Sequence, residues 1–150
     1  MAKAAVVLAV LTGMLLGVGA FTFDYAAGFS YFSNEPEACV NCHIMNDHFD
    51  SWVKSSHHAH AVCNDCHTPH ALVAKYVSKA ENGFNHSLKF TLGTYREPIR
   101  IRPVNAARLQ ANCIECHQEL VSEIRWEANL AHEDLDCVRC HAAVGHGPRR

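Results

Sequence analysis

The pentapeptide Cys39-Val40-Asn41-Cys42-His43 is the stretch from which the fold of this chain follows. Its pattern, two cysteines three positions apart followed at once by histidine, recurs at 63–67, 113–117 and 137–141. Together the four motifs use all 8 cysteines of the chain. Two thiols at this spacing reach the two vinyl groups of one porphyrin, and the adjacent histidine lies under the iron. The pattern therefore predicts four covalently bound haem c groups.

Two other uses of the cysteines compete with haem attachment. Paired Cys-x-x-Cys motifs also form zinc sites, and an even number of cysteines fits a disulfide framework. Neither alternative accounts for a histidine directly after every cysteine pair, so haem attachment is favoured. The predicted thioether-forming residues are Cys39, Cys42, Cys63, Cys66, Cys113, Cys116, Cys137 and Cys140.

Composition and spacing indicate the organisation of the chain. It has 150 residues, 19% charged and 49% hydrophobic, with a net charge of -2, which excludes a disordered chain and a polybasic nucleic-acid binder. The motifs begin 24, 50 and 24 residues apart, which indicates two dihaem modules at about 39–67 and 113–141. Short alternating apolar runs are absent, so we expect a mostly α fold with extensive loops.

An uncharged stretch at 4–23 precedes the motifs, and aromatic residues follow it. As a helix it is about 30 Å long, the thickness of a bilayer's hydrocarbon core. A cleaved signal peptide is the alternative, because Val18-Gly19-Ala20 resembles a cleavage site, but signal cores usually run only about 7–15 residues. We expect a single-pass anchor at 1–24 in the inner membrane. Lys3 on the cytoplasmic side then puts the domain at 25–150 in the periplasm.

The segments around the third motif and before it are expected to be helical. A helix is predicted over 69–92, with Pro69 at its first position, followed by a loop to residue 103. Further helices are predicted over 105–112 and 116–131. Lys79 and His86 are seven residues apart, two helical turns, and therefore share one face of the first of these helices.

Eight histidines lie outside the motifs and are candidates for the second axial position of the irons. The internal repeat favours His58 and His132, each five residues before a motif, and His70 and His146 after the second motif of each module. The complete set is His48, His57, His58, His60, His70, His86, His132 and His146. The first motif differs because it continues to Met45, and thioether sulfur is a known haem ligand. His43 and Met45 therefore both remain candidates for the first iron.

In these features the chain resembles the NapC/NirT family of membrane-anchored tetrahaem quinol dehydrogenases. Within that family it is most similar to the NrfH type, the small subunit of cytochrome c nitrite reductase. The resemblance rests on the anchor, the motif spacing, the Cys-x-x-Cys-His-x-Met pattern and the segment Lys79-Ala80-Glu81-Asn82-Gly83-Phe84-Asn85-His86. It implies that Met45 is the proximal ligand of the first haem. It also implies that Lys79 and residue 86 lie beside that haem, where menaquinol binds.

The resemblance implies the remaining iron ligands by position. His67, His117 and His141 are the proximal ligands of haems two, three and four. The distal ligands are His146 for the second haem and His57 for the third, although the internal repeat favours His58. The fourth haem takes a lysine from the partner enzyme, which leaves His132 without an assigned role.

The function implied is that of a menaquinol dehydrogenase. It passes electrons through four haems to the catalytic subunit of a periplasmic nitrite reductase, in a membrane-bound hetero-oligomer without a nucleic-acid partner. The alternatives are a NapC-type subunit that feeds another reductase, such as nitrate reductase, and a soluble tetrahaem carrier with a cleaved signal. In that function Lys79 is expected to stabilise the developing quinolate. His86 is either the base that takes a proton or a ligand of the first iron.

Overall fold

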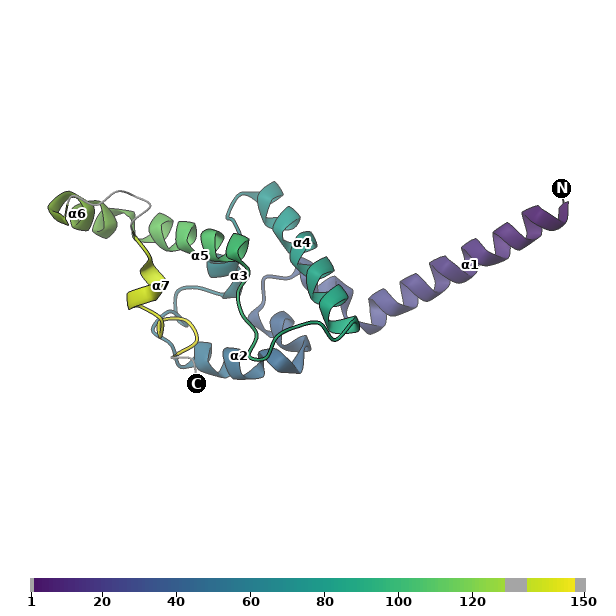
Figure 1. Cartoon of the computed structure of the whole chain (residues 1–150), viewed down its shortest axis with the longest axis horizontal. Coiled ribbons are helices and arrows are strands. Elements are labelled where there is room, and N and C mark those ends of the chain that lie inside the picture. Colours follow the sequence, from purple (N-terminus) through teal and green to yellow (C-terminus); the bar gives the residue numbers. More distant parts are fainter. Residues whose placement is uncertain (1, 129–134, 148–150) are drawn as a thin grey trace. The chain divides into compact units, whose positions relative to one another are not determined.

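The structure, a computed structural model, describes residues 2–128 and 135–147 (Figure 1). Within these ranges the regular structure is helical and no β-strand occurs, which confirms the predicted mostly α class with extensive loops. The chain divides into two compact units, Met1–Ser33 and Asn34–Arg150. Each is described by itself below.

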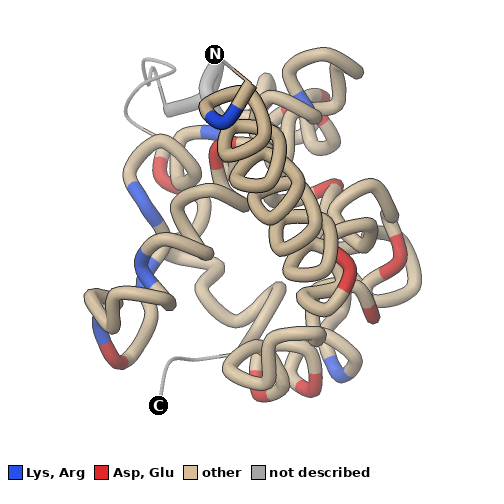
Figure 2. Tube along the Cα trace, turned by 90° about the vertical axis from the view of Figure 1, so that its right-hand side faces the viewer, with Lys and Arg blue, Asp and Glu red and all other residues tan. Residues whose placement is uncertain are grey.

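The first unit consists mainly of α1, Ala2–Tyr25, a helix of 24 residues. Its mean hydropathy is 2.3 and none of its residues is buried, so by length and composition it can cross a membrane. The charged residues of α1 are Lys3 and Asp24, near its two ends, and Figure 2 shows the helix without charge along most of its length. A signal sequence at the N-terminus has the same properties, so retention of this helix remains a prediction.

Aromatic side chains gather where α1 ends and the short 3-10 helix η1, Gly28–Phe32, begins. The Phe23 and Phe29 rings pack edge to face, with their centroids 5.0 Å apart. A Cβ atom at position 28 would collide with the Phe23 ring, so Gly28 is what allows this close approach. The cluster has the composition of an aromatic belt at a membrane surface.

The second unit is built from short helices and connecting loops. Their bounds are η2 Pro36–Asn41, η3 His43–Met45, α2 Asn46–Val53, α3 Cys63–His67, α4 Leu72–Thr91, α5 Pro103–Cys116, α6 Gln118–Ala128 and α7 Cys137–Cys140. Figure 1 shows α3 and α7 next to α5, against which both pack. The central position of α5 brings motifs that are distant in sequence to one helix.

The helix predicted over 69–92 is α4, and it begins three residues later than expected. Pro69 is therefore not its first residue, and Ala71 is the N-cap with extended dihedrals of φ -64° and ψ 130°. The delay has a local cause, because His70 Nε2 lies 3.0 Å from the Asp65 carbonyl oxygen. This contact turns the chain back toward α3 before the helix can start.

The end of α4 is set by Gly93. Its φ of 62° is in the left-handed region, which glycine adopts without steric cost. The Gly93 N–H donates to the Phe90 carbonyl at 3.2 Å, and the Thr94 N–H donates to the Lys89 carbonyl at 3.0 Å. These two bonds form the Schellman arrangement that ends many helices.

Helix α5 is longer than predicted at both ends. Pro103, expected in the preceding loop, occupies the first turn, where its missing N–H costs no hydrogen bond. The predicted break after residue 112 is wrong, because the helix continues through the third motif to Cys116 and has its C-cap at His117. Residues 113–116 of the third motif are therefore part of α5.

The interior of this protein is polar. Among the residues that the structure describes, no hydrophobic side chain is buried. Pro36 and four polar or charged residues are buried, namely Thr68, Ser78, Lys79 and Asn112. A domain of this size ordinarily needs an apolar core, so this burial pattern is in keeping with porphyrin faces that supply the apolar surface.

Candidate functional site

The first Cys-x-x-Cys-His motif differs in backbone conformation from the other three. The second forms α3, the third ends α5, and the fourth forms α7. In the first motif, Cys42 is extended, with φ -97° and ψ 112°, and separates η2 from η3. Met45 at the end of η3 is half-buried while His43 is exposed. The first motif, which differs from the others in sequence by the following Met45, thus also differs from them in backbone conformation.

His67 of the second motif faces His146 from the C-terminal segment. Their Nε2 atoms are 3.4 Å apart and their ring centroids 5.7 Å apart. His146 Nδ1 lies 3.1 Å from the His48 carbonyl oxygen, which fixes the proton on Nδ1 and leaves Nε2 with a lone pair. Burial and the neighbouring His146 lower the pKa of His67 to about 4, so its ring is neutral, as a metal ligand must be.

His57 faces His117 of the third motif, with ring centroids 6.1 Å apart. His57 Nδ1 lies 3.2 Å from the Ser56 hydroxyl. His58 instead packs edge-on against Trp52 at 4.7 Å. The structure therefore places His57, and not His58, opposite a motif histidine.

His67 and His146 have a separation that suits one ion between their rings. Metal–imidazole bonds of about 2.0–2.1 Å put two opposed nitrogens about 4 Å apart, close to the 3.4 Å between His67 and His146 Nε2. Each motif also supplies two cysteines for covalent attachment, so the donor set fits haem c. The His57–His117 pair joins the first predicted module to the second, and the His67–His146 pair joins the first module to the segment that follows the second.

The remaining histidine candidates have different surroundings. His70 Nδ1 lies 2.9 Å from Glu115 Oε1, and its Nε2 contacts the Asp65 carbonyl, so both ring nitrogens are engaged. Glu115 is also the main cause of the raised pKa of His70. His141 of the fourth motif is exposed. His132, which the internal repeat favours, lies outside the described residues.

Lys79 lies beside the first motif. Its side chain is largely buried, with 9% exposed, and its Nζ is 5.9 Å from the centre of the Tyr76 ring. A hydrogen bond with the Cys63 thiol, helped by the Lys79 charge, lowers the pKa of the Cys39 thiol to about 7. Burial and the neighbouring Lys75 lower the pKa of Lys79 itself. A buried cation therefore stands next to the first attachment site.

His86 shares a face of α4 with Lys79 but has a different environment. Part of the His86 residue is exposed, whereas Lys79 is buried, but the packed surroundings of the His86 imidazole still desolvate it. Desolvation and the charges of Arg102 and Lys89 lower the pKa of His86 below its ordinary value. Its imidazole is therefore neutral at neutral pH and able to accept a proton.

A polar clamp, formed by Glu81, Asn82, Arg102, Asn105 and Arg108, holds α4 against the start of α5. Glu81 accepts from Arg102 at 2.7 Å and from Arg108 at 2.8 Å. The Asn105 amide donates to Asn82 Oδ1 at 2.8 Å. Sequence reasoning missed the clamp, because its hydrogen bonds between α4 and the start of α5 join residues 20 or more positions apart and follow no spacing rule.

The rival uses of the cysteines find no support in the structure. All eight cysteines are free of disulfides. In the parts of the chain that are described, no cluster of three or more histidine, cysteine or acidic residues could hold a metal ion. Zinc binding by four protein side chains therefore has no site there.

Comparison with known proteins agrees with the motifs. The model of the NapC/NirT cytochrome c family, N-terminal region, matches residues 1–149. The cytochrome c-type protein NrfH of Wolinella succinogenes is 40% identical, over 94% of this chain and 85% of that protein. The cytochrome c nitrite reductase subunit NrfH of Nitratidesulfovibrio vulgaris is 36% identical, over 91% of this chain and 82% of that protein.

A solved structure has the same fold. It is a crystal structure of the cytochrome c nitrite reductase NrfHA complex bound to the HQNO inhibitor, and one of its chains is similar with a TM-score of 0.64 and 32% identity. The similarity covers 92% of this chain and 90% of that one. The match over nearly the whole length, the motifs and the helical fold lead to one conclusion: the chain belongs to the NapC/NirT cytochrome c family.

Proposed function

We propose that this protein is the membrane-anchored, quinol-oxidising subunit that delivers electrons to the catalytic subunit of a cytochrome c nitrite reductase. The observation that carries the proposal is the buried Lys79 beside Cys39 of the first motif, in a chain similar to NrfH proteins. The solved relative is a complex with a nitrite reductase and binds the HQNO inhibitor. The quinol proposed here is menaquinol.

Four haem c groups are proposed to be attached through the eight motif cysteines. The residues that would hold the irons are Met45 for the first haem, His67 with His146 for the second, His117 with His57 for the third, and His141 for the fourth. The facing histidine pairs and the half-buried Met45 support this assignment. When bound, the haems supply a series of one-electron acceptors and donors.

Lys79 is proposed to stabilise the negative charge that develops on a quinol oxygen as its proton leaves. The Lys79 residue is largely buried, and burial lowers the pKa of its ammonium. A charge interaction is stronger at a site of lower effective dielectric. The Ser78 hydroxyl beside it is fully buried and has no hydrogen-bond partner among the described residues.

His86 is proposed to accept the proton. Its pKa is lowered by desolvation and by Arg102, so the neutral imidazole predominates at neutral pH. Its exposure to solvent also gives the proton a way out. His86 and Lys79 are separated by two helical turns, about 10 Å along the helix axis. This spacing allows the two side chains to contact the two hydroxyl groups at opposite ends of a quinol ring.

The placement of the chain in the cell is part of the proposal. Helix α1 serves as the single-pass anchor of the inner membrane at 1–24, and residues 25–150 lie in the periplasm. Its length, its hydropathy of 2.3 and the similarity to NrfH proteins support a membrane anchor. The single Lys3 before the helix supports the orientation.

The partner is proposed to dock at the fourth motif, where it donates a lysine to the fourth haem in a hetero-oligomer. The exposure of His141 and Cys140 supports an accessible site there. A NapC-type subunit that feeds nitrate reductase is the second candidate within the family. Both curated relatives described above are NrfH proteins, which favours the nitrite reductase partner.

Purification from detergent-solubilised membranes tests the proposal. We expect a pyridine haemochrome spectrum of haem c and co-purification of a larger nitrite-reducing cytochrome subunit. A nitrate reductase in its place would favour the NapC-type role. Recovery of the chain only in the soluble fraction, with an N-terminus beyond residue 20, would establish the soluble carrier and contradict the anchor.

A further inference from the structure

Two carboxamide side chains of α5 hold backbone groups of other motifs. Asn112 and Gln110 lie near the C-terminal end of α5, directly before the third motif at 113–117. They are two residues apart, about 200° around the helix, and so project from opposite sides. Their hydrogen bonds reach the second motif in one direction and the fourth motif in the other.

Asn112 fixes the backbone on both sides of His67. Its Nδ2 donates to the Cys66 carbonyl at 3.0 Å and to the Thr68 carbonyl at 2.8 Å. The Asn112 residue is buried, with 6% exposed, and Thr68 is equally buried. Both hydrogens of one amide are thus used to hold the two carbonyls that flank the second motif's histidine. Because Cys113 follows directly, the second and third motifs are tied together at this point.

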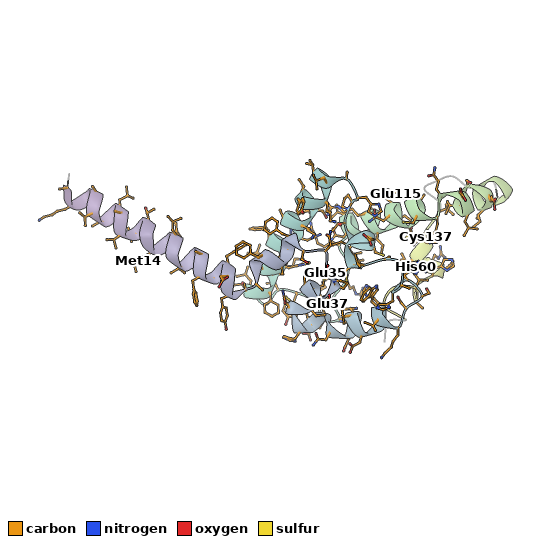
Figure 3. The ribbon with its side chains drawn as sticks, turned by 180° about the vertical axis from the view of Figure 1, so that it is seen from behind. Met14, Glu35, Glu37, His60, Glu115 and Cys137 are labelled. Carbon is orange, nitrogen blue, oxygen red and sulfur yellow. The ribbon has the colours of Figure 1, made fainter. Side chains whose placement is uncertain are left out.

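Gln110 makes the corresponding contacts with the fourth motif. Its Nε2 donates to the Leu135 carbonyl at 2.9 Å, and its Oε1 accepts from the Cys137 N–H at 3.0 Å. The Gln110 carboxamide therefore uses both its N–H donor and its oxygen acceptor on the backbone of this segment. Cys137 is itself an attachment cysteine at the start of α7, and Figure 3 shows it near Glu115 of α5.

We propose that Asn112 and Gln110 are positioning residues that set the mutual placement of the second, third and fourth haems. Helix α5 carries the third motif, Asn112 orients His67, and Gln110 holds Cys137. This inference rests on the proposed function, because it requires that the motifs carry haem. An apolar replacement leaves the two carbonyls or the N–H without their partners, so the attached motif shifts while α5 remains.

The experiment compares Asn112→Leu with Gln110→Met in the full-length, detergent-solubilised holoprotein. Haem content is measured by pyridine haemochrome, and each haem by its electron paramagnetic resonance signal and its midpoint potential in a redox titration. The signals of the second and fourth haems are first assigned with His146→Met and His141→Met. Electron equilibration among the haems is followed after rapid partial reduction.

We expect each variant to act on a different haem. Asn112→Leu should alter the signal and potential of the second haem and slow equilibration roughly tenfold or more, the scale on which loss of a contact that orients a metal ligand lowers the activity of metal sites. Gln110→Met should alter the fourth haem and leave the second as in the wild type. Asn85→Leu is the control, because its amide donates to the Glu81 carbonyl within α4 at 2.8 Å and joins no motifs.

If Asn112→Leu loses haem, the same measurements are made on Asn112→Ser, which keeps one hydrogen-bond donor at this position. Loss confined to the second haem, with a smaller change in Asn112→Ser, supports the proposal. Wild-type signals and equilibration in both Asn112 variants would overturn it, as would equal loss at all sites in the Asn112 and Gln110 variants. A wild-type protein without haem c would instead contradict the proposed function, so the two failures are distinguishable.

Discussion

Replacement of Lys79 by leucine is the perturbation that addresses the proposed chemistry most sharply. Leucine keeps an apolar side chain on α4 but removes the cation, which is 9% exposed and lies near Cys39. At about 4 Å and an effective dielectric constant of about 20, opposite unit charges interact with about 4 kcal/mol. Removal of a single oxyanion-stabilising donor costs about 2.7–4 kcal/mol in other enzymes. We therefore expect quinol oxidation to fall about 100- to 1,000-fold.

The assay is anaerobic oxidation of a reduced menaquinone analogue, followed by the absorbance of the haem band in the detergent-solubilised protein. Dithionite should still reduce Lys79→Leu fully, which shows that its haems are attached and functional. Lys54→Leu is the matched control, because Lys54 is an exposed lysine at the end of α2. Near-wild-type oxidation by Lys79→Leu, or an equal loss in Lys54→Leu, would refute the assignment of the quinol site.

Three further predictions concern the ligands and the base. Met45→His should lower the midpoint potential of the first haem, since thioether ligation raises the potential; an unchanged potential argues against Met45 ligation. His57→Ala should open the third haem to a high-spin form while His58→Ala does not, because His57 faces His117; the reverse result would favour His58. Quinol oxidation should fall as the pH is lowered through a midpoint below 6.5, where His86 becomes protonated, and His86→Gln should remove this limb of the pH profile; a profile unaltered in the variant rules out the base role.

The sequence predicts the parts of this protein that depend on local pattern. The helical class follows from the lack of alternating runs, and α4 lies where its helix was expected, apart from its first residues. The late start could not be foreseen, because it depends on the contact between His70 and the Asp65 carbonyl. The continuation of α5 through the third motif was missed because nothing in the spacing of Cys113 and Cys116 distinguishes a helix from a loop.

The contacts that organise the candidate site lie beyond local pattern. The internal repeat favours His58, and only the packing of its ring on Trp52 shows why His57 is the one that faces His117. Asn112 and Glu81 carry no sequence signal, because their partners are backbone carbonyls and arginines brought together by folding. Such residues become visible only when the tertiary contacts are known.

The most direct test of the central claim is the choice of electron acceptor by the purified chain without a partner. We predict that it oxidises a menaquinol analogue with an artificial one-electron acceptor, yet does not reduce nitrite until the catalytic subunit is added. The prediction follows because the proposed site, Lys79 with His86 on α4, is suited to a quinol. Nitrite reduction by the isolated chain, or no quinol oxidation by a protein that dithionite reduces fully, would contradict the account.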